Sequence, residues 1–91
     1  MEQKMNIKEM KFWQENQDTL NYLVEKYFEL PTTQTIKGCY IALTREQWHI
    51  LGVMHAYILE YERDITINAE NSFIFNRIEQ LRRNSIIVDK E

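Results

Sequence analysis

The most reactive side chains in this chain of 91 residues are those of one cysteine, Cys39, and two histidines, His49 and His55. A nucleophilic cysteine needs a histidine or another cationic group nearby to lower its pKa. A zinc-binding pair on a helix needs two histidines four residues apart, whereas these two are six apart and project on different sides. Cys39 stands beside Tyr40 and Ile41, which is typical of a small buried apolar residue. We therefore expect Cys39 to pack in the core, and we expect no metal site.

His55 has two interpretations. On a helical projection it lies between Leu51 and Trp48, in mostly apolar surroundings, with Glu62 two turns further along the same line. As a functional group it would be a pH-responsive contact or a base held by a carboxylate. As a structural group it would be a half-buried histidine bonded to a tyrosine or to the backbone. No nucleophile or second ligand stands at a helical spacing from it, which favours the structural interpretation.

Motifs for catalysis are missing from the sequence. It contains no P-loop, no Gly-rich nucleotide loop, no Gly-x-Ser-x-Gly, no His-Glu-x-x-His and no paired-cysteine motif. Its acidic and basic residues are scattered over faces that we expect to be solvated. The sequence therefore predicts a protein that is not an enzyme and has no cofactor.

Composition predicts one small helical domain over residues 1–91, with frayed ends at 1–5 and 89–91. Hydrophobic residues make up 44% and charged residues 27%, and two glycines and one proline favour helices over a many-turned sandwich. A single cysteine cannot form an internal disulfide and suits a reducing compartment. The sequence lacks an apolar run of about 18–20 residues, and residues 1–10 lack the apolar region of a secretory signal. We expect a cytoplasmic protein without membrane association.

The stretch from Leu43 to Asp64 is the most apolar segment. Thr44 and Gln47 fit a capping box, with Leu43 and Trp48 at the positions of a hydrophobic staple. At 100° per residue, its apolar side chains fill an arc of roughly 160°. This pattern predicts a buried central helix.

A first helix is predicted from Ile7 to Leu30, because apolar residues again share one face and Pro31 ends it. Asn6 and Glu9 give a capping signal at its start. The polar run 14–19 marks a bend or a break. Within it, Asn16 falls on the apolar face, where it either overhangs the core or sets the register of a self-association seam.

A third helix is predicted from Ala69 to about Asn84, capped by Asn68, with an apolar stripe at Ile74, Ile78 and Leu81. Short strands are the other expected elements. Cys39–Leu43 is predicted to be a strand. Residues 32–36 could pair with it across a Lys-Gly turn, and the β-leaning pieces 64–68 and 85–88 could join it. The predicted fold is mainly α, with a long first helix, a buried central helix, a shorter last helix and a short β element between the first two.

Phe73 lies off the apolar stripe of the last helix, near Arg77, Gln80 and Asn84. Aromatic and arginine side chains together are typical of protein-interface anchors. Arginine, glutamine and asparagine side chains could equally contact a nucleic acid, but residues 69–84 carry a net charge of only +1 and the chain one of −3. The alternative to a binding role is a structural one, in which Phe73 packs beneath the loop at 64–68. The residues predicted to bind a partner are Phe73, Arg77, Gln80, Arg83, Asn84 and, on the first helix, Tyr22.

Gly52 and Ala56 form a narrow strip of small residues on the central helix, where another helix could approach closely. That helix could be the first helix of the same chain or a helix of a second copy. With Asn16, the second case would give a homodimer. The functional prediction is a small cytosolic protein that binds another protein as an inhibitor, adaptor or immunity-type factor. The Asn, Ile, Lys and Glu-rich composition points to a bacterium, phage or mobile element. The alternative is a small DNA-binding transcriptional regulator that uses the Arg77/Gln80/Arg83 face, although nucleic acid is the less favoured partner.

Overall fold

The computed structural model describes residues 4–26 and 41–88. Short helical segments come first, two long helices follow, and two short strands complete the fold. In chain order the elements are η1 (Ile7–Glu9), α1 (Lys11–Glu15), α2 (Gln17–Lys26), β1 (Ile41–Leu43), α3 (Arg45–Glu60), η2 (Glu62–Asp64), α4 (Ala69–Arg83) and β2 (Ser85–Ile87).

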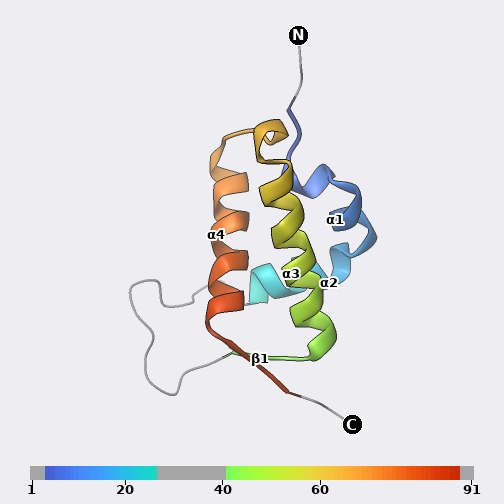
Figure 1. The fold of residues 1–91 in the computed structure, drawn as a ribbon, viewed down its shortest axis with the longest axis vertical. Helices are drawn as coiled ribbons and strands as arrows, with labels where there is room; N and C mark the ends of the chain where they lie inside the picture. Colours follow the sequence, from blue (N-terminus) through green and yellow to red (C-terminus); the bar gives the residue numbers. More distant parts are fainter. Residues whose placement is uncertain (1–3, 27–40, 89–91) are drawn as a thin grey trace.

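Figure 1 shows α3 and α4 as two neighbouring antiparallel rods. α1 lies on the other side of α3 from α4, and α2 passes behind α3 toward α4. The domain is mainly helical, as predicted, with a two-stranded sheet at the end where α3 begins and α4 ends. Among the helices of the described residues, none combines the length and the apolar character that a membrane crossing requires.

The predicted central helix is confirmed as α3. Both hydrogen bonds of its capping box are formed at the start of the helix. Gln47 N donates to Thr44 Oγ1 over 3.1 Å, and Thr44 N donates to Gln47 Oε1 over 3.0 Å. These bonds pair two of the backbone N–H groups that a helix start leaves without partners. The buried residues of α3 are Ile50, Leu51, Met54 and Ile58.

The predicted last helix is confirmed as α4. Asn68 caps it, since its side chain accepts from Asn71 N over 2.8 Å. The stripe of Ile74, Ile78 and Leu81 is buried against the rest of the core. Because both cap and stripe are local signals, the start of the helix could be placed from the sequence.

The single long helix predicted over 7–30 is wrong in its continuity: breaks at Met10 and Asn16 separate η1, α1 and α2. Met10 is extended, with φ −69° and ψ 146°, and starts α1 by accepting from Gln14 N. Asn16 ends α1 and starts α2, since its backbone N–H contacts the Phe12 carbonyl and its own carbonyl accepts from Leu20 N over 2.9 Å. The Asn16 side chain also donates to the Phe12 carbonyl, over 3.1 Å, an alternative to helix continuation that asparagine offers readily. The predicted break within 14–19 is therefore confirmed at Asn16, while the one at Met10 was not expected.

A short β element does lie between α2 and α3, and its partner is the C-terminal β2. The two strands are parallel, with Leu43 opposite Ile87, and Val88 N donates to the Leu43 carbonyl over 2.8 Å. A parallel pair needs a long crossover, which α3 and α4 supply here. The predicted strand at 32–36, the first two residues of the strand predicted at 39–43, and Cys39 itself lie outside the described residues.

Candidate functional site

The outer face of α4 carries a shallow hollow of about 370 Å³, which we call the helix-4 hollow. Four of the predicted partner-binding residues meet in it, although Asn84 and Tyr22 are not part of its lining. Their spacing along one regular helix brings them together, as the sequence pattern predicted. The hollow is lined by Phe73, Asn76, Arg77, Glu79, Gln80 and Arg83.

An aromatic–cation pair forms the centre of the helix-4 hollow. The guanidinium carbon of Arg77 lies 5.0 Å from the centre of the Phe73 ring. Phe73 is 40% exposed, whereas Arg77 is only 8% exposed. Burial lowers the pKa of the Arg77 guanidinium from its ordinary value, yet arginine stays protonated in proteins. The pair therefore combines a partly exposed apolar ring with a positive charge that is fixed beside it.

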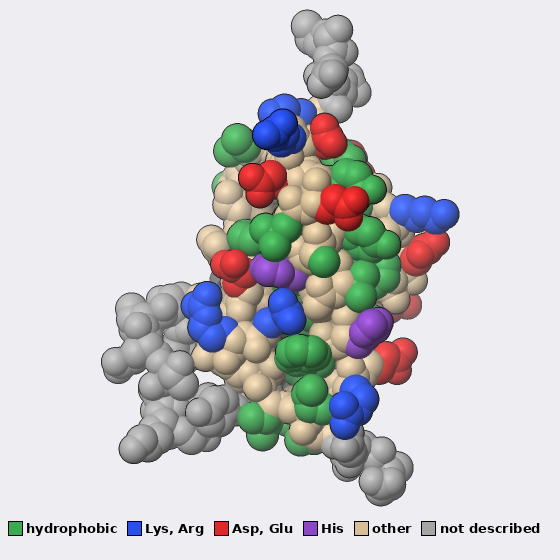
Figure 2. Space-filling model, in the orientation of Figure 1, with side chains coloured by type: hydrophobic (Ala, Val, Ile, Leu, Met, Phe, Trp, Pro, Cys, Tyr) green, Lys and Arg blue, Asp and Glu red, His purple; other side chains and the backbone are tan. Residues whose placement is uncertain are grey.

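A second cluster fills the seam between α3 and α4, centred on Arg82. Its guanidinium lies 5.0 Å from the Trp48 ring centre and crosses Gly52, where an added Cβ would stand 3.7 Å from Nη2. The close approach that Gly52 permits is therefore used by a side chain of the same chain. Ala56, the other small residue of the predicted self-association strip, is exposed. Figure 2 shows histidine and basic side chains among apolar ones on this face of the molecule.

His55 belongs to the same seam. Its Nε2 lies 3.5 Å from Glu79 Oε2, and its Nδ1 lies 3.5 Å from Arg82 Nη1. Its ring stacks on Phe75 with centres 5.3 Å apart and planes within 8°. The carboxylate beside it thus comes from α4, and not from Glu62 as the helical projection suggested. In the part of the chain that the structure describes, no group of three or more His, Cys, Asp or Glu side chains is arranged to hold a metal ion.

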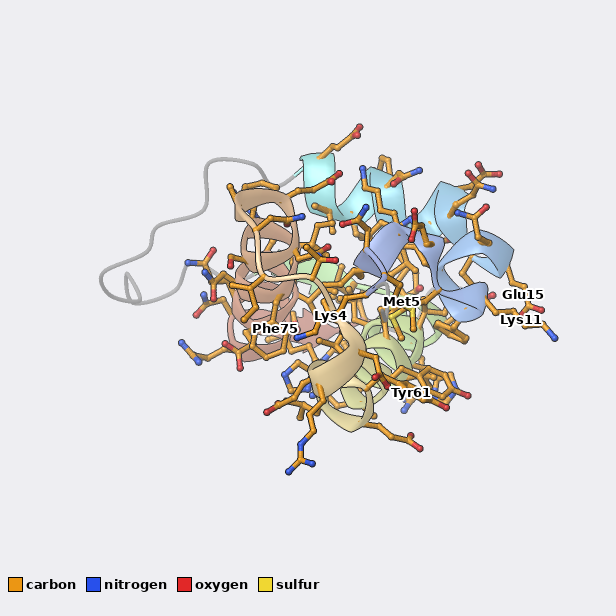
Figure 3. All side chains as sticks on the ribbon, turned by 90° about the horizontal axis from the view of Figure 1, so that it is seen from above. Lys4, Met5, Lys11, Glu15, Tyr61 and Phe75 are labelled. Atoms are coloured by element: carbon orange, nitrogen blue, oxygen red, sulfur yellow. The ribbon has the colours of Figure 1, made fainter. Side chains whose placement is uncertain are left out.

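A further concave surface, of about 480 Å³, was not predicted. It lies between the N-terminal segment and the end of α3, and we call it the aromatic groove. Figure 3 shows Met5 at its inner edge, with Tyr61 on one side and Lys11 and Glu15 on the other. Its lining consists of Met5, Glu9, Met10, Lys11, Phe12, Glu15, Tyr57 and Tyr61.

Three rings form a row in the aromatic groove. The Phe12 and Tyr57 ring centres are 5.5 Å apart, with planes tilted by 50°, and those of Tyr57 and Tyr61 are 6.3 Å apart. Tyr57 and Tyr61 are one helical turn apart at the end of α3, but Phe12 reaches them only because the chain bends at Met10 and Asn16. The i, i+4 spacing of the two tyrosines was the only signal in the sequence that could have indicated the row.

A buried asparagine holds the N-terminal wall of the groove in place. Asn71, 4% exposed, accepts from Ile7 N over 2.9 Å and donates to the Thr66 carbonyl over 2.7 Å. Next to it, Met5 pairs with Ile65 as a parallel bridge, with two backbone bonds of 2.9 Å. These contacts join segments that are far apart in the sequence, since Ile7 and Asn71 are separated by 64 residues.

Comparison of the chain with protein-family models, with curated proteins and with solved structures gave no match.

Proposed function

We propose that this is a small cytosolic protein that binds another protein with the outer face of α4. It would act by covering a surface of that partner, as an inhibitor, adaptor or immunity-type factor of a bacterium, phage or mobile element. One observation carries the proposal: a half-exposed phenylalanine, a buried arginine and four further polar side chains line one hollow on a rigid helix. Interface energy is usually concentrated in such aromatic and arginine anchors.

Two features favour a protein over DNA as the partner of the helix-4 hollow. Arg77 is buried and its guanidinium lies 5.0 Å from the Phe73 ring centre, so it does not project as a groove-reading side chain would. Glu79 lines the same hollow and would repel phosphates. The DNA-binding alternative keeps Arg83 and Gln80 as its contacts, and it predicts a mobility shift at low salt that fades steeply as salt rises.

The test is affinity capture from a lysate of the source cells, with the wild type compared with Phe73→Ala and Arg83→Ala. We expect one stoichiometric protein partner that is lost from Phe73→Ala and reduced with Arg83→Ala. The matched controls are Ile67→Ala, an apolar residue that is 89% exposed outside the hollow, and Arg63→Ala, an exposed arginine on η2. Equal capture by all five proteins would contradict the assigned surface, and a mobility shift without a protein partner would favour the DNA alternative.

Self-association through Asn16, Gly52 and Ala56 is a separate proposal. Exposure of Ala56 supports it, whereas Asn16 and Gly52 are both engaged by groups of their own chain. Light scattering at micromolar concentration measures it directly: a dimer mass supports the proposal, and a monomer mass contradicts it.

A further inference from the structure

We propose that the aromatic groove is a second binding site, which takes a basic, partly apolar segment of another protein and places one arginine or lysine side chain on the row of rings. The inference does not depend on the function proposed for α4, because the two concave surfaces share no lining residue. Three properties of the groove support it: its rings, its charges and its methionines.

The rings favour a cation. Tyr61 is 39% exposed at the outer end of the row, and Tyr57 and Phe12 continue it inward, with both half-buried. The face of an aromatic ring carries negative electrostatic potential and attracts an ammonium or guanidinium group within about 6 Å. A partner side chain with a long aliphatic stem and a cationic head would cover the rings along its whole length.

The charges of the lining select the same sign of partner. Glu9 and Glu15 contribute two carboxylates, and Lys11 contributes one ammonium group, so the lining is net negative. The helix-4 hollow has the opposite balance, with Arg77 and Arg83 against Glu79. An acidic segment would therefore be repelled from the aromatic groove, and a basic one would be attracted.

The methionines let the groove adapt to apolar neighbours of the cation. Met5 is half-buried and Met10 is buried, and both line the groove beside the rings. Methionine has an unbranched, polarizable side chain that fills irregular gaps and is common at adaptable binding surfaces. A basic segment with aliphatic residues on either side of its arginine would fit this lining better than an isolated cation.

The test uses full-length protein labelled with ¹³C at the methionine methyl groups and titrated with a capped pentapeptide, Gly-Leu-Arg-Leu-Gly. We expect the Met5 and Met10 signals to shift, while that of Met54, which is fully buried in α3, stays fixed. Replacing the peptide's arginine by citrulline, its neutral counterpart, should weaken binding about fivefold, and replacing it by glutamate should abolish binding.

Variants of the groove separate its parts. Tyr61→Leu keeps an apolar side chain but removes the ring, and should weaken binding of the arginine peptide about fivefold. Glu15→Gln should weaken it about twofold, and the difference should vanish at high salt. The controls are Leu59→Ala on the same helix, Glu25→Gln on α2 and Phe73→Ala on α4. None of them lines the groove, so none should change the titration.

Three results would overturn the proposal. The first is the absence of Met5 and Met10 shifts at millimolar peptide, and the second is equal binding of the arginine and glutamate peptides. The third is a shift of these signals with protein concentration alone, which would assign the groove to a second copy of the chain. Loss of partner capture by Phe73→Ala with an unchanged peptide titration would leave both surfaces standing as independent sites.

Discussion

The two concave surfaces of this molecule are built in different ways. Within the part of the chain that the structure describes, the lining of the helix-4 hollow comes from one regular helix, so its residues follow the helical spacing from Phe73 to Arg83. The aromatic groove is lined by the segment 5–15 and by the end of α3, more than 40 residues further along the chain. The main residues of the first surface could be grouped from the sequence. The second surface combines residues on both sides of the break at Met10 with residues at the end of α3. Helical spacing in the sequence can therefore predict a surface whose residues all lie on one helix, but not one assembled from separate segments.

The two surfaces have opposite charge balances. If both bind partners as we propose, the hollow would favour acidic or neutral groups around an apolar contact, and the groove would favour a basic segment. A protein that used both would hold two partners at once, as an adaptor does. Variants that change the contacts holding one surface and leave those of the other intact can separate the two.

The largest effect is expected from Asn71→Ala. The substitution leaves the Ile7 N–H and the Thr66 carbonyl without their partner, and unpaired buried groups of this kind cost about 2–3 kcal/mol together. We expect the free energy of unfolding in urea to fall by that amount, and the Met5 signal to shift as the N-terminal wall loosens. Ser72→Ala, its exposed neighbour on α4, is the control and should change neither. If Asn71→Ala had wild-type stability, the hydrogen-bond network would not hold the groove.

A smaller effect is expected from Asn16→Ala. The variant loses the bond from its side chain to the Phe12 carbonyl, worth about 1 kcal/mol in urea unfolding. Because alanine favours a continuous helix, we also expect the Phe12 ring to move relative to Tyr57, with no change at Phe73. Gln17→Ala, an exposed neighbour, is the control. Unchanged ring signals at Tyr57 would show that the break does not depend on this residue.

Gly52→Ala, in the helix that lies between the two surfaces, is expected to raise the stability of the fold instead of lowering it. The added Cβ would meet the Arg82 guanidinium at 3.7–3.8 Å, which is ordinary contact distance. Alanine is the better helix former, so thermal unfolding should show a gain of roughly 0.5–1 kcal/mol. A loss of stability would show that the Arg82 side chain cannot move aside for the added methyl group. A loss of dimer without a loss of stability would support self-association at Gly52.

The smallest effect is expected from Lys8→Ala. Lys8 Nζ lies 3.9 Å from Glu70 Oε2, across the gap between η1 and α4, and both side chains are well exposed. Solvent screens such a pair, so its loss should cost no more than about 0.5 kcal/mol and should disappear in high salt. A larger cost, persisting in salt, would mean that this contact and not Asn71 joins the groove to α4.

The sequence predicted the parts of the fold that depend on local signals. The caps at Thr44 and Asn68 located α3 and α4, and the apolar face predicted for the first segment is buried at Trp13 and Leu23. Within 7–26 the predicted apolar face is buried although the helix is not continuous, because η1, α1 and α2 each turn their apolar side inward. Residues 27–30 of the predicted helix lie outside the described residues. The break at Met10 was missed because no proline or glycine marks it. The contacts that fix the preceding segment come from distant residues, since Ile7 N donates to Asn71 and Met5 pairs with Ile65.

The candidate sites divide in the same way. Phe73, Arg77, Gln80 and Arg83 could be grouped from helical spacing, and they do line one hollow. The setting of His55 could not be read, because its neighbours Glu79 and Arg82 come from another helix. The parallel pairing of Leu43 with Ile87 could not be predicted either, because it depends on how the packing of α3 and α4 brings the C-terminal strand beside β1.

The central claim is that the helix-4 hollow is the surface that meets a partner protein, and site-specific photo-cross-linking tests it most directly. A benzophenone side chain is placed, one protein at a time, at Phe73, Gln80 and the control position Ile67, and the protein is irradiated in the source cells. We predict one protein adduct of the same mass from positions 73 and 80 and none from 67. Adducts from 67 alone, equal adducts from all three, or adducts to nucleic acid only would contradict it.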